Sequence, residues 1–263
     1  MKTRDSNGNT AIVNGVSTDR TPMTSMRKTS LFAGGLYLLT FVSIPTLALY
    51  GSIHDPNYIV GPGPDSAVII GSILEIIVAL AGIGTAVALY PVLKKQNEGL
   101  ALGLVSARVL EAGTIFAGVM FLLTVVTLRQ AGVGADALVT GHTLVTMYDR
   151  VFLIGQSFMP AVNDLLLGFL LYQSRLVPRG LSLIGIIGGP VLIAGDISVL
   201  FGLIGQRDPT TALFAIPVAL FEFSLGIWLV VKGFNSISAA TAPVQNLFML
   251  AATTKTTTPE LSN

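Results

Sequence analysis

The 263-residue sequence has no cysteine, two histidines and few charged side chains. The lack of cysteine excludes disulfide bonds and cysteine-ligated zinc or iron–sulfur sites. His54 and His142 fall in predicted loops, so no histidine is available deep in an apolar segment to hold haem or a metal. No GxSxG, HExxH, P-loop or GxGxxG motif occurs in a setting that would support it. We therefore expect no cofactor and no metal, and we lean against an enzyme, with that question left open.

Charged residues make up 11% of the chain, and hydrophobic residues make up 52%. Soluble domains contain about 25% charged residues, so this chain lacks the polar side chains to cover a soluble surface. Lipid accepts apolar surface, and the composition predicts an integral membrane protein in contact with the lipid bilayer. The net charge of +1 gives no signal for nucleic-acid binding.

Long apolar runs separated by short turn-rich connections dominate the rest of the chain. A helix needs about 20 apolar residues to cross a bilayer. The pattern predicts an all-α membrane bundle with six transmembrane helices, at 30–53, 66–93, 100–128, 150–173, 181–204 and 212–234.

The remaining segments are polar or mixed. Residues 1–29 predict a disordered cytoplasmic N-terminal tail, 30–234 the six-helix domain, and 235–263 a flexible cytoplasmic C-terminal tail. Met1, Met23 and Met26 are alternative start residues. Residues 129–149 interleave apolar and polar side chains, which favours a short amphipathic helix lying at the outer membrane surface.

Lysine and arginine placement predicts the orientation, because cytoplasmic loops carry an excess of these residues. With both termini in the cytoplasm, only Arg129, Arg150 and Arg207 fall outside, and Arg108 falls within a span. Tyr50 and Tyr148 then lie at outer helix ends, where we expect their rings to sit in the interface.

Several polar side chains interrupt the apolar segments. Arg108 and Glu111 are three residues apart, so they share one helix face and can pair. Ionisable residues inside a membrane are costly and mark functional sites by default. The candidate site for a proton or ligand comprises Glu75, Arg108, Glu111, Asn163, Asp164, Asp196 and Glu222.

Two prolines precede acids in this set: Pro160 precedes Asp164, and Pro190 precedes Asp196. Each proline frees a backbone carbonyl, and transporters build substrate and ion sites from such interrupted helices. Ordinary membrane helices are kinked by proline in the same way, and for each proline taken alone this structural role is the favoured interpretation.

Two functions stay open. In the first, the protein is a small transporter linked to a proton or a cation, in which at least three of the acids border one central cavity and Glu111 and Glu222 lie nearest its middle. In the second, it is a non-catalytic sensor or accessory subunit whose buried polar residues are structural. Substrate, protein partner and oligomeric state are not predicted.

Three stretches, YPVLKKQNEGLALGLVSARVLEAG, LLYQSRLVPRGLSLIGIIGG and LFEFSLGIWLVVKGF, together resemble the bacterial membrane family called domain of unknown function 4386. The resemblance covers about Thr29 to Phe234. It implies a multi-pass protein of the bacterial cytoplasmic (inner) membrane with no established activity. It carries over no catalytic residues, so the candidate site depends on physical reasoning alone.

Overall fold

The structure, a computed structural model, describes residues 25–235, which form helices and no strand. The predicted tails lie outside this range, except that residues 25–29 belong to the first helix and Asn235 bonds to the carbonyl oxygens of Arg175 and Leu176. The elements are α1 (Ser25–Thr40), η1 (Phe41–Ser43), α2 (Thr46–Leu49), η2 (Ser52–His54), α3 (Asp65–Leu93), α4 (Glu98–Gln130), η3 (Gly134–Ala137), α5 (Leu138–Phe152), η4 (Leu153–Phe158), α6 (Met159–Ser174), α7 (Arg179–Leu200) and α8 (Pro209–Val231).

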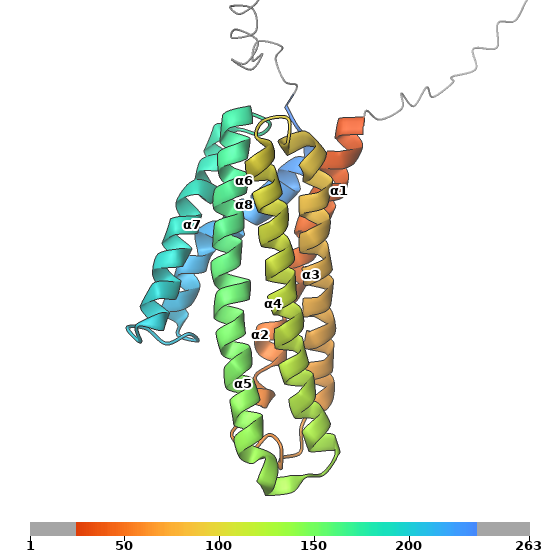
Figure 1. Cartoon of the computed structure of the whole chain (residues 1–263), viewed down its shortest axis with the longest axis vertical. Helices are drawn as coiled ribbons and strands as arrows, with labels where there is room; N and C mark the ends of the chain where they lie inside the picture. The colour runs from red at the N-terminus through yellow and green to blue at the C-terminus, as the bar shows by residue number, and fades with distance from the viewer. Residues whose placement is uncertain (1–24, 236–263) are drawn as a thin grey trace, which may run out of the picture.

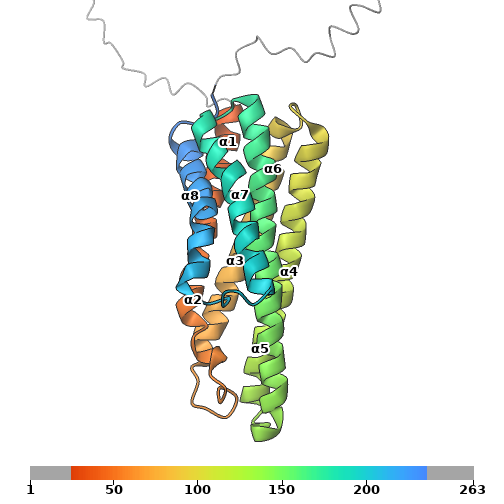
Figure 2. The same cartoon turned by 90° about the vertical axis from the view of Figure 1, so that its left-hand side faces the viewer.

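Six helical segments are long and apolar enough to cross a membrane. They run along the long axis of the molecule, side by side (Figures 1 and 2). This confirms the predicted all-α bundle and makes the chain a multi-pass membrane protein. The spans are Ser25–Leu49, Asp65–Leu93, Glu98–Gln130, Gly134–Ser174, Arg179–Leu200 and Pro209–Val231.

The predicted amphipathic helix is present as α5, but it is continuous with the fourth span and does not form a separate helix lying at the membrane surface. α5 is amphipathic, but it continues through the π-helical turn η4 into α6 without a loop. Its inner face packs against α4 and the 50–59 segment, where Tyr148, Val125 and Ile59 share one apolar cluster. Burial against protein therefore replaces burial in the lipid interface.

The resulting hairpin of α4 and α5–α6 is longer than the membrane requires. α4 has 33 residues, which corresponds to about 50 Å at 1.5 Å per residue. The hydrocarbon core is about 30 Å thick. The lower part of the hairpin extends past the ends of α7 and α8 (Figure 1), where Arg129 pairs with Asp65 at 2.7 Å and closes α4 onto α3.

Small residues bring the helices together. A Cβ atom on Gly185 would lie 2.8 Å from the ring of Phe221 in α8, and one on Gly189 would lie 2.7 Å from the carbonyl oxygen of Ala161 in α6. α7 is thus held between α6 and α8 by close approach. Lipid competes with apolar side chains, so such van der Waals contact and not hydrophobic burial drives association in a bilayer.

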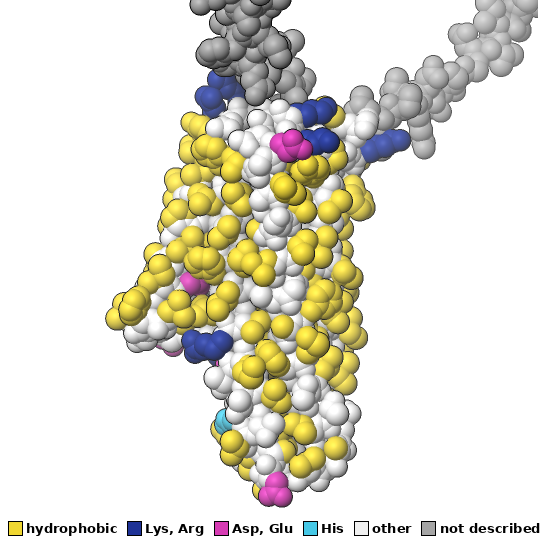
Figure 3. Space-filling view, viewed as in Figure 1, with side chains coloured by type: hydrophobic (Ala, Val, Ile, Leu, Met, Phe, Trp, Pro, Cys, Tyr) yellow, Lys and Arg dark blue, Asp and Glu magenta, His cyan; other side chains and the backbone are white. Residues whose placement is uncertain are grey.

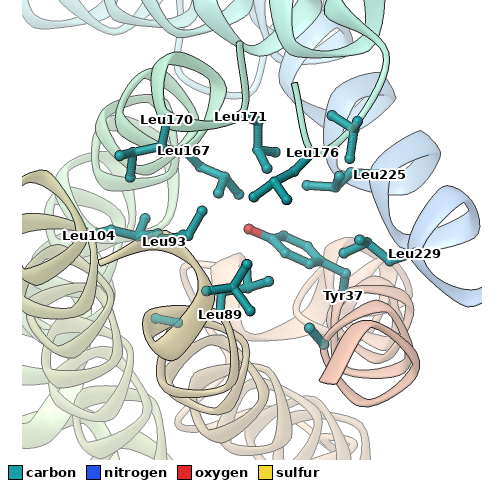
Figure 4. Packing of buried hydrophobic residues seen from close by; sticks show 14 of the residues in the cluster. Tyr37, Leu89, Leu93, Leu104, Leu167, Leu170, Leu171, Leu176, Leu225 and Leu229 are labelled. Carbon is teal, nitrogen blue, oxygen red and sulfur yellow. The ribbon is translucent and has the colours of Figure 1, made fainter. Parts of the chain in front are cut away.

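A leucine-rich cluster fills the half of the bundle near the start of α1. Figure 4 shows Tyr37 directing its hydroxyl toward the leucines of this cluster, which come from several helices. On the outside, hydrophobic side chains cover most of the visible face, and Lys and Arg gather at the end where α1 begins (Figure 3). The apolar exterior is suited to contact with lipid. The polar side chains of the spans lie in the interior.

Candidate buried polar site

Arg108 is the centre of a buried polar cluster. Its guanidinium donates to both carboxylate oxygens of Glu111, at 3.2 and 3.0 Å, within α4. It also donates to Glu222 of α8 at 2.6 Å. Its side chain is only 4% exposed, so these bonds form away from water, where charge-assisted bonds are strong. The pairing predicted from the spacing of Arg108 and Glu111 is present, and Glu222 is a second partner.

Two neighbours complete this arrangement. Asn163 of α6 donates to Glu111 at 2.6 Å. The Tyr37 hydroxyl of α1 accepts from Arg108 at 3.4 Å, and the guanidinium lies over the Tyr37 ring at 5.6 Å. Gly82 of α3 faces the Arg108 side chain without a Cβ of its own. Arg108 of α4 therefore contacts side chains of α1 and α8 and faces the backbone of α3 at Gly82, and its partner Glu111 bonds to α6.

Asp164 differs from the other acids of the cluster. It is fully buried and interacts electrostatically with Glu222, Arg108 and Glu111. Neither of its carboxyl oxygens has a hydrogen-bond partner among the described residues. An unpaired ionised carboxyl in such a place is very costly, so Asp164 is expected to carry a proton or to hold a ligand or water.

The Arg108 cluster, defined as Arg108, Glu111, Asn163, Asp164 and Glu222, contains one base and three acids. The guanidinium is in contact with two carboxylates, and no further cation lies in the described part of the cluster to balance a third. Direct contact with the guanidinium brings Glu111 and Glu222 together. A water-filled cavity at this place stays a prediction.

Glu75 belongs to a second polar group nearer the outer end. It accepts from the Tyr148 hydroxyl at 2.7 Å and from the Gln156 amide at 3.3 Å. Tyr50 packs edge-on against Tyr148, with 5.5 Å between ring centroids. Tyr50 and Tyr148, whose rings were expected to sit in the membrane interface, are instead buried in protein, where the Tyr148 hydroxyl bonds the Glu75 carboxyl.

Asp196 stands apart from both groups. It accepts from Ser157 at 2.6 Å, its one hydrogen bond to a described side chain. Ser157 and Gln156 both lie in η4, so this single π-helical turn serves Glu75 on one side and Asp196 on the other. π-helical turns recur at functional sites. η4 ends just before Pro160, which has no N–H to offer the helix; α7, in contrast, continues through Pro190.

An apolar layer lies between Glu75 and the Arg108 cluster. Ala79 follows Glu75 by one turn of α3, and it packs with Ala112, Ile115 and Val119 of α4. These α4 residues begin directly after Glu111. Where α3 meets α4, the two polar groups are therefore separated along the bundle by apolar side chains. Thr114 of α4, whose hydroxyl donates to the Glu111 carbonyl oxygen, faces Gly155 of η4 instead.

Sequence reasoning missed Tyr37, Tyr148, Gln156 and Ser157 as partners of the buried acids. Their residue types indicated that they would need hydrogen-bond partners, because they place hydroxyl and amide groups inside apolar segments. Their positions in the sequence did not indicate which acid each would contact. Among residues 25–235, no three side chains of His, Cys, Asp or Glu come close enough together to hold a metal ion.

Comparison with known proteins adds a family and no activity. Residues 32–233 match the family model described as "Domain of unknown function (DUF4386)". No curated protein and no solved structure matches the chain.

Proposed function

The chain belongs to the domain of unknown function 4386 family, whose description names no activity, and we propose from its buried site that it is a proton-linked transporter of a small solute. The observation that carries this proposal is Asp164. A fully buried carboxyl with two unpartnered oxygens, near an arginine that already pairs with two other carboxylates, is a place for a proton that can come and go.

The contacts of Arg108 supply the coupling. While Asp164 is protonated and neutral, Arg108 is free to bind Glu111 and Glu222 as in the structure. When Asp164 loses its proton, the new carboxylate competes for the same guanidinium, because an unpaired buried charge is costly. Any shift of Arg108 away from Glu222 loosens α4 from α8. Gain or loss of the Asp164 proton thus changes how α4 packs against α8. Alternating access requires a helix movement of this kind.

The proposal places the protein in the bacterial cytoplasmic membrane with both termini inside. The even number of spans puts the start of α1 and the end of α8 at one end, together with the α3–α4 and α6–α7 connections. Lys94, Lys95, Arg175 and Arg179 flank those two connections. This concentration supports a cytoplasmic assignment.

A non-catalytic sensor or accessory subunit is the second candidate. The favouring observation is that Glu111 receives direct hydrogen bonds from both Arg108 and Asn163, as a packing device would. Asp164 separates the candidates, because a purely structural cluster has no use for a carboxyl without partners.

The test uses the purified full-length protein in liposomes that contain a pH-sensitive dye. A potassium diffusion potential drives proton entry, with and without a panel of amino acids, sugars and organic cations outside. We expect wild type to acidify the lumen faster than protein-free liposomes, Asp164→Asn to lose this activity, and Asp196→Asn to keep it. Wild-type rates equal to protein-free rates under all conditions would overturn the proposal.

A further inference from the structure

We propose that Glu75, Tyr50 and Tyr148 form an outer proton-exchange site, which moves protons between the outer surface and the Arg108 cluster. This inference rests on the proposed proton-linked function and deepens it by assigning the route on the outer side. We call these three residues the outer site.

The outer site is built around an incompletely satisfied carboxyl. Glu75 is fully buried, and its Oε1 atom accepts from Tyr148 and Gln156, whereas Oε2 has no partner among the described residues. The buried Tyr50 hydroxyl interacts electrostatically with Glu75 and also has no hydrogen-bond partner there. Two unsatisfied oxygens on neighbouring groups leave a place for a proton and a water molecule.

A glycine in α3 leaves room for the Tyr50 ring at this position. A Cβ on Gly71 of α3 would lie 2.9 Å from Cζ of Tyr50. The ring therefore lies directly against the α3 backbone, one turn of helix before Glu75. Such close approach holds the hydroxyl at the carboxyl and leaves it little freedom to turn toward the surface.

A partly exposed pair, His54 and Asp149, connects the outer site to water. His54 faces the Tyr50 carbonyl oxygen with Nδ1, at 2.7 Å, and Asp149 with Nε2, at 3.2 Å. Asp149 directly follows Tyr148 and also accepts from Arg207 at 2.7 Å. The His54 and Tyr148 rings lie 6.5 Å apart. The side chains of His54 and Asp149 are 16% and 25% exposed, so outer water reaches the pair.

The proton transfer balances at each atom. A hydronium ion at the His54–Asp149 pair gives a proton to the Tyr148 hydroxyl oxygen while the original Tyr148 proton passes to Oε1 of ionised Glu75. The hydroxyl is regenerated, Glu75 becomes a neutral acid, and the hydronium ion is left as a water molecule. A tyrosine hydroxyl suits this role because it donates and accepts at one oxygen.

The apolar layer of Ala79, Ala112, Ile115 and Val119 then acts as the barrier between the outer site and Asp164. A proton on Glu75 cannot continue while this layer is dry. It continues only when helix movement admits water, so exchange with the outside and exchange with the centre occur in turn. That separation prevents a simple proton leak.

A structural interpretation makes a different prediction. If Glu75 only accepts the Tyr148 bond to hold α3 against α5, then Glu75→Gln, which keeps an acceptor oxygen of the same shape, should preserve every property. The exchange role fails in that variant, because a glutamine cannot take up the proton. The two interpretations therefore separate on a nearly isosteric change.

The experiment measures dye-reported proton uptake in liposomes and, on the same proteins, the infrared carbonyl band of protonated carboxyl groups over a range of pH. We expect Glu75→Gln to slow uptake by about tenfold or more, as for loss of a proton-transfer group, and to remove one pH-dependent carbonyl band. Tyr148→Phe should slow uptake while keeping that band. Asp196→Asn, a buried acid outside both groups, should match wild type in uptake.

The outcomes separate the two proposals. Wild-type uptake by Glu75→Gln, alongside loss of uptake in Asp164→Asn, would overturn the outer site and leave the proposed function in place. Wild-type protein without uptake would remove the proposed function, and the infrared titration would still decide whether Glu75 exchanges protons. Unchanged melting temperatures for Glu75→Gln and Tyr148→Phe show that an effect is not due to unfolding.

Discussion

At the scale of single residues, Arg108 decides how the interior is organised. It contacts Glu111 in its own helix and Glu222 across the bundle, and it lies over Tyr37. A buried ion pair is weak support for stability in itself, because both charges must lose water. The Arg108 pairs matter most when one partner is removed, because the remaining charged side chain is then buried without a partner and without water.

We predict strong coupling between Arg108 and Glu222. Arg108→Leu should destabilise the protein by about 3–5 kcal/mol, as expected when one partner of a buried pair is removed. Adding Glu222→Leu should recover part of the loss, because it removes a stranded carboxylate. The measurement is unfolding in mixed detergent micelles for the two single variants and the double variant.

The control for that cycle is a pair at the end of the hairpin, Arg129 and Asp65, whose side chains are 17% and 19% exposed. Truncating Arg129 should cost less, because water can solvate the Asp65 that remains. A double variant of Arg108 and Glu222 as unstable as the sum of its singles would show that the two residues are not coupled.

His54 gives a pH dependence at the outer end. Burial lowers the pKa of His54, and the charge of Arg207 lowers it further, whereas the Tyr50 carbonyl and Asp149 raise it; Tyr148 also faces the ring. The unfolded chain has a histidine pKa of about 6.5. As the pH falls through that value the unfolded state binds more protons than the folded state, and stability decreases.

We therefore predict that the melting temperature falls between pH 7.5 and pH 5 and that His54→Gln reduces this fall. The glutamine removes the titrating group and keeps a polar side chain of similar reach. Melting curves of both proteins over this range are the measurement. Parallel pH profiles for wild type and variant would contradict the assigned role of burial at His54.

At the scale of elements, η4 is the segment that gives the long helix two polar faces. Its π-helical turn directs Gln156 to Glu75 and Ser157 to Asp196. A regular helix offers neighbouring residues at about 100° intervals, and the wider turn changes that register locally. η4 also approaches α4 closely, because Gly155 lies against Thr114.

We predict that Gly155→Ala destabilises the protein by about 1–3 kcal/mol, the usual effect of overpacking. A Cβ there would clash with the Cβ and Oγ1 atoms of Thr114. Combining it with Thr114→Gly should recover part of the loss, because both clashing atoms are removed. The matched control is Gly113→Ala, whose Cβ would meet no atom within 4 Å. Thermal unfolding in detergent is the measurement, and equal effects of Gly155→Ala and Gly113→Ala would refute the contact.

At the scale of the whole molecule, the bundle has one end rich in Lys and Arg and one long hairpin that extends from the other (Figures 1 and 3). The proposed orientation puts the basic end in the cytoplasm and the extended hairpin outside. The outer site then lies on the side from which external protons arrive.

We predict that a reporter fused after Phe234 reports a cytoplasmic location, whereas a reporter inserted in the α7–α8 connection near Arg207 reports a periplasmic one. The six spans require opposite signals at these two positions. Paired alkaline phosphatase and fluorescent-protein fusions in bacterial cells are the measurement. A periplasmic signal after Phe234 would show that the orientation is inverted.

The sequence by itself determined the class, the six spans and the Arg108–Glu111 pair. Apolar run length depends on the bilayer, and an i, i+3 spacing depends on helix geometry, so both are local properties. Local reasoning failed at α5, where the amphipathic pattern was assigned to lipid and the actual partner is protein.

Only the tertiary structure decided which side chains that are far apart in the sequence come into contact. Glu222 meets Arg108 across 114 positions of sequence, and Tyr148 meets Glu75 across 73. Nothing in the local pattern of either residue distinguishes these partners from the other buried acids. Helix rotation and close approach at glycines select them, because in lipid the packing of whole helices, and not the burial of single apolar residues, determines which faces meet.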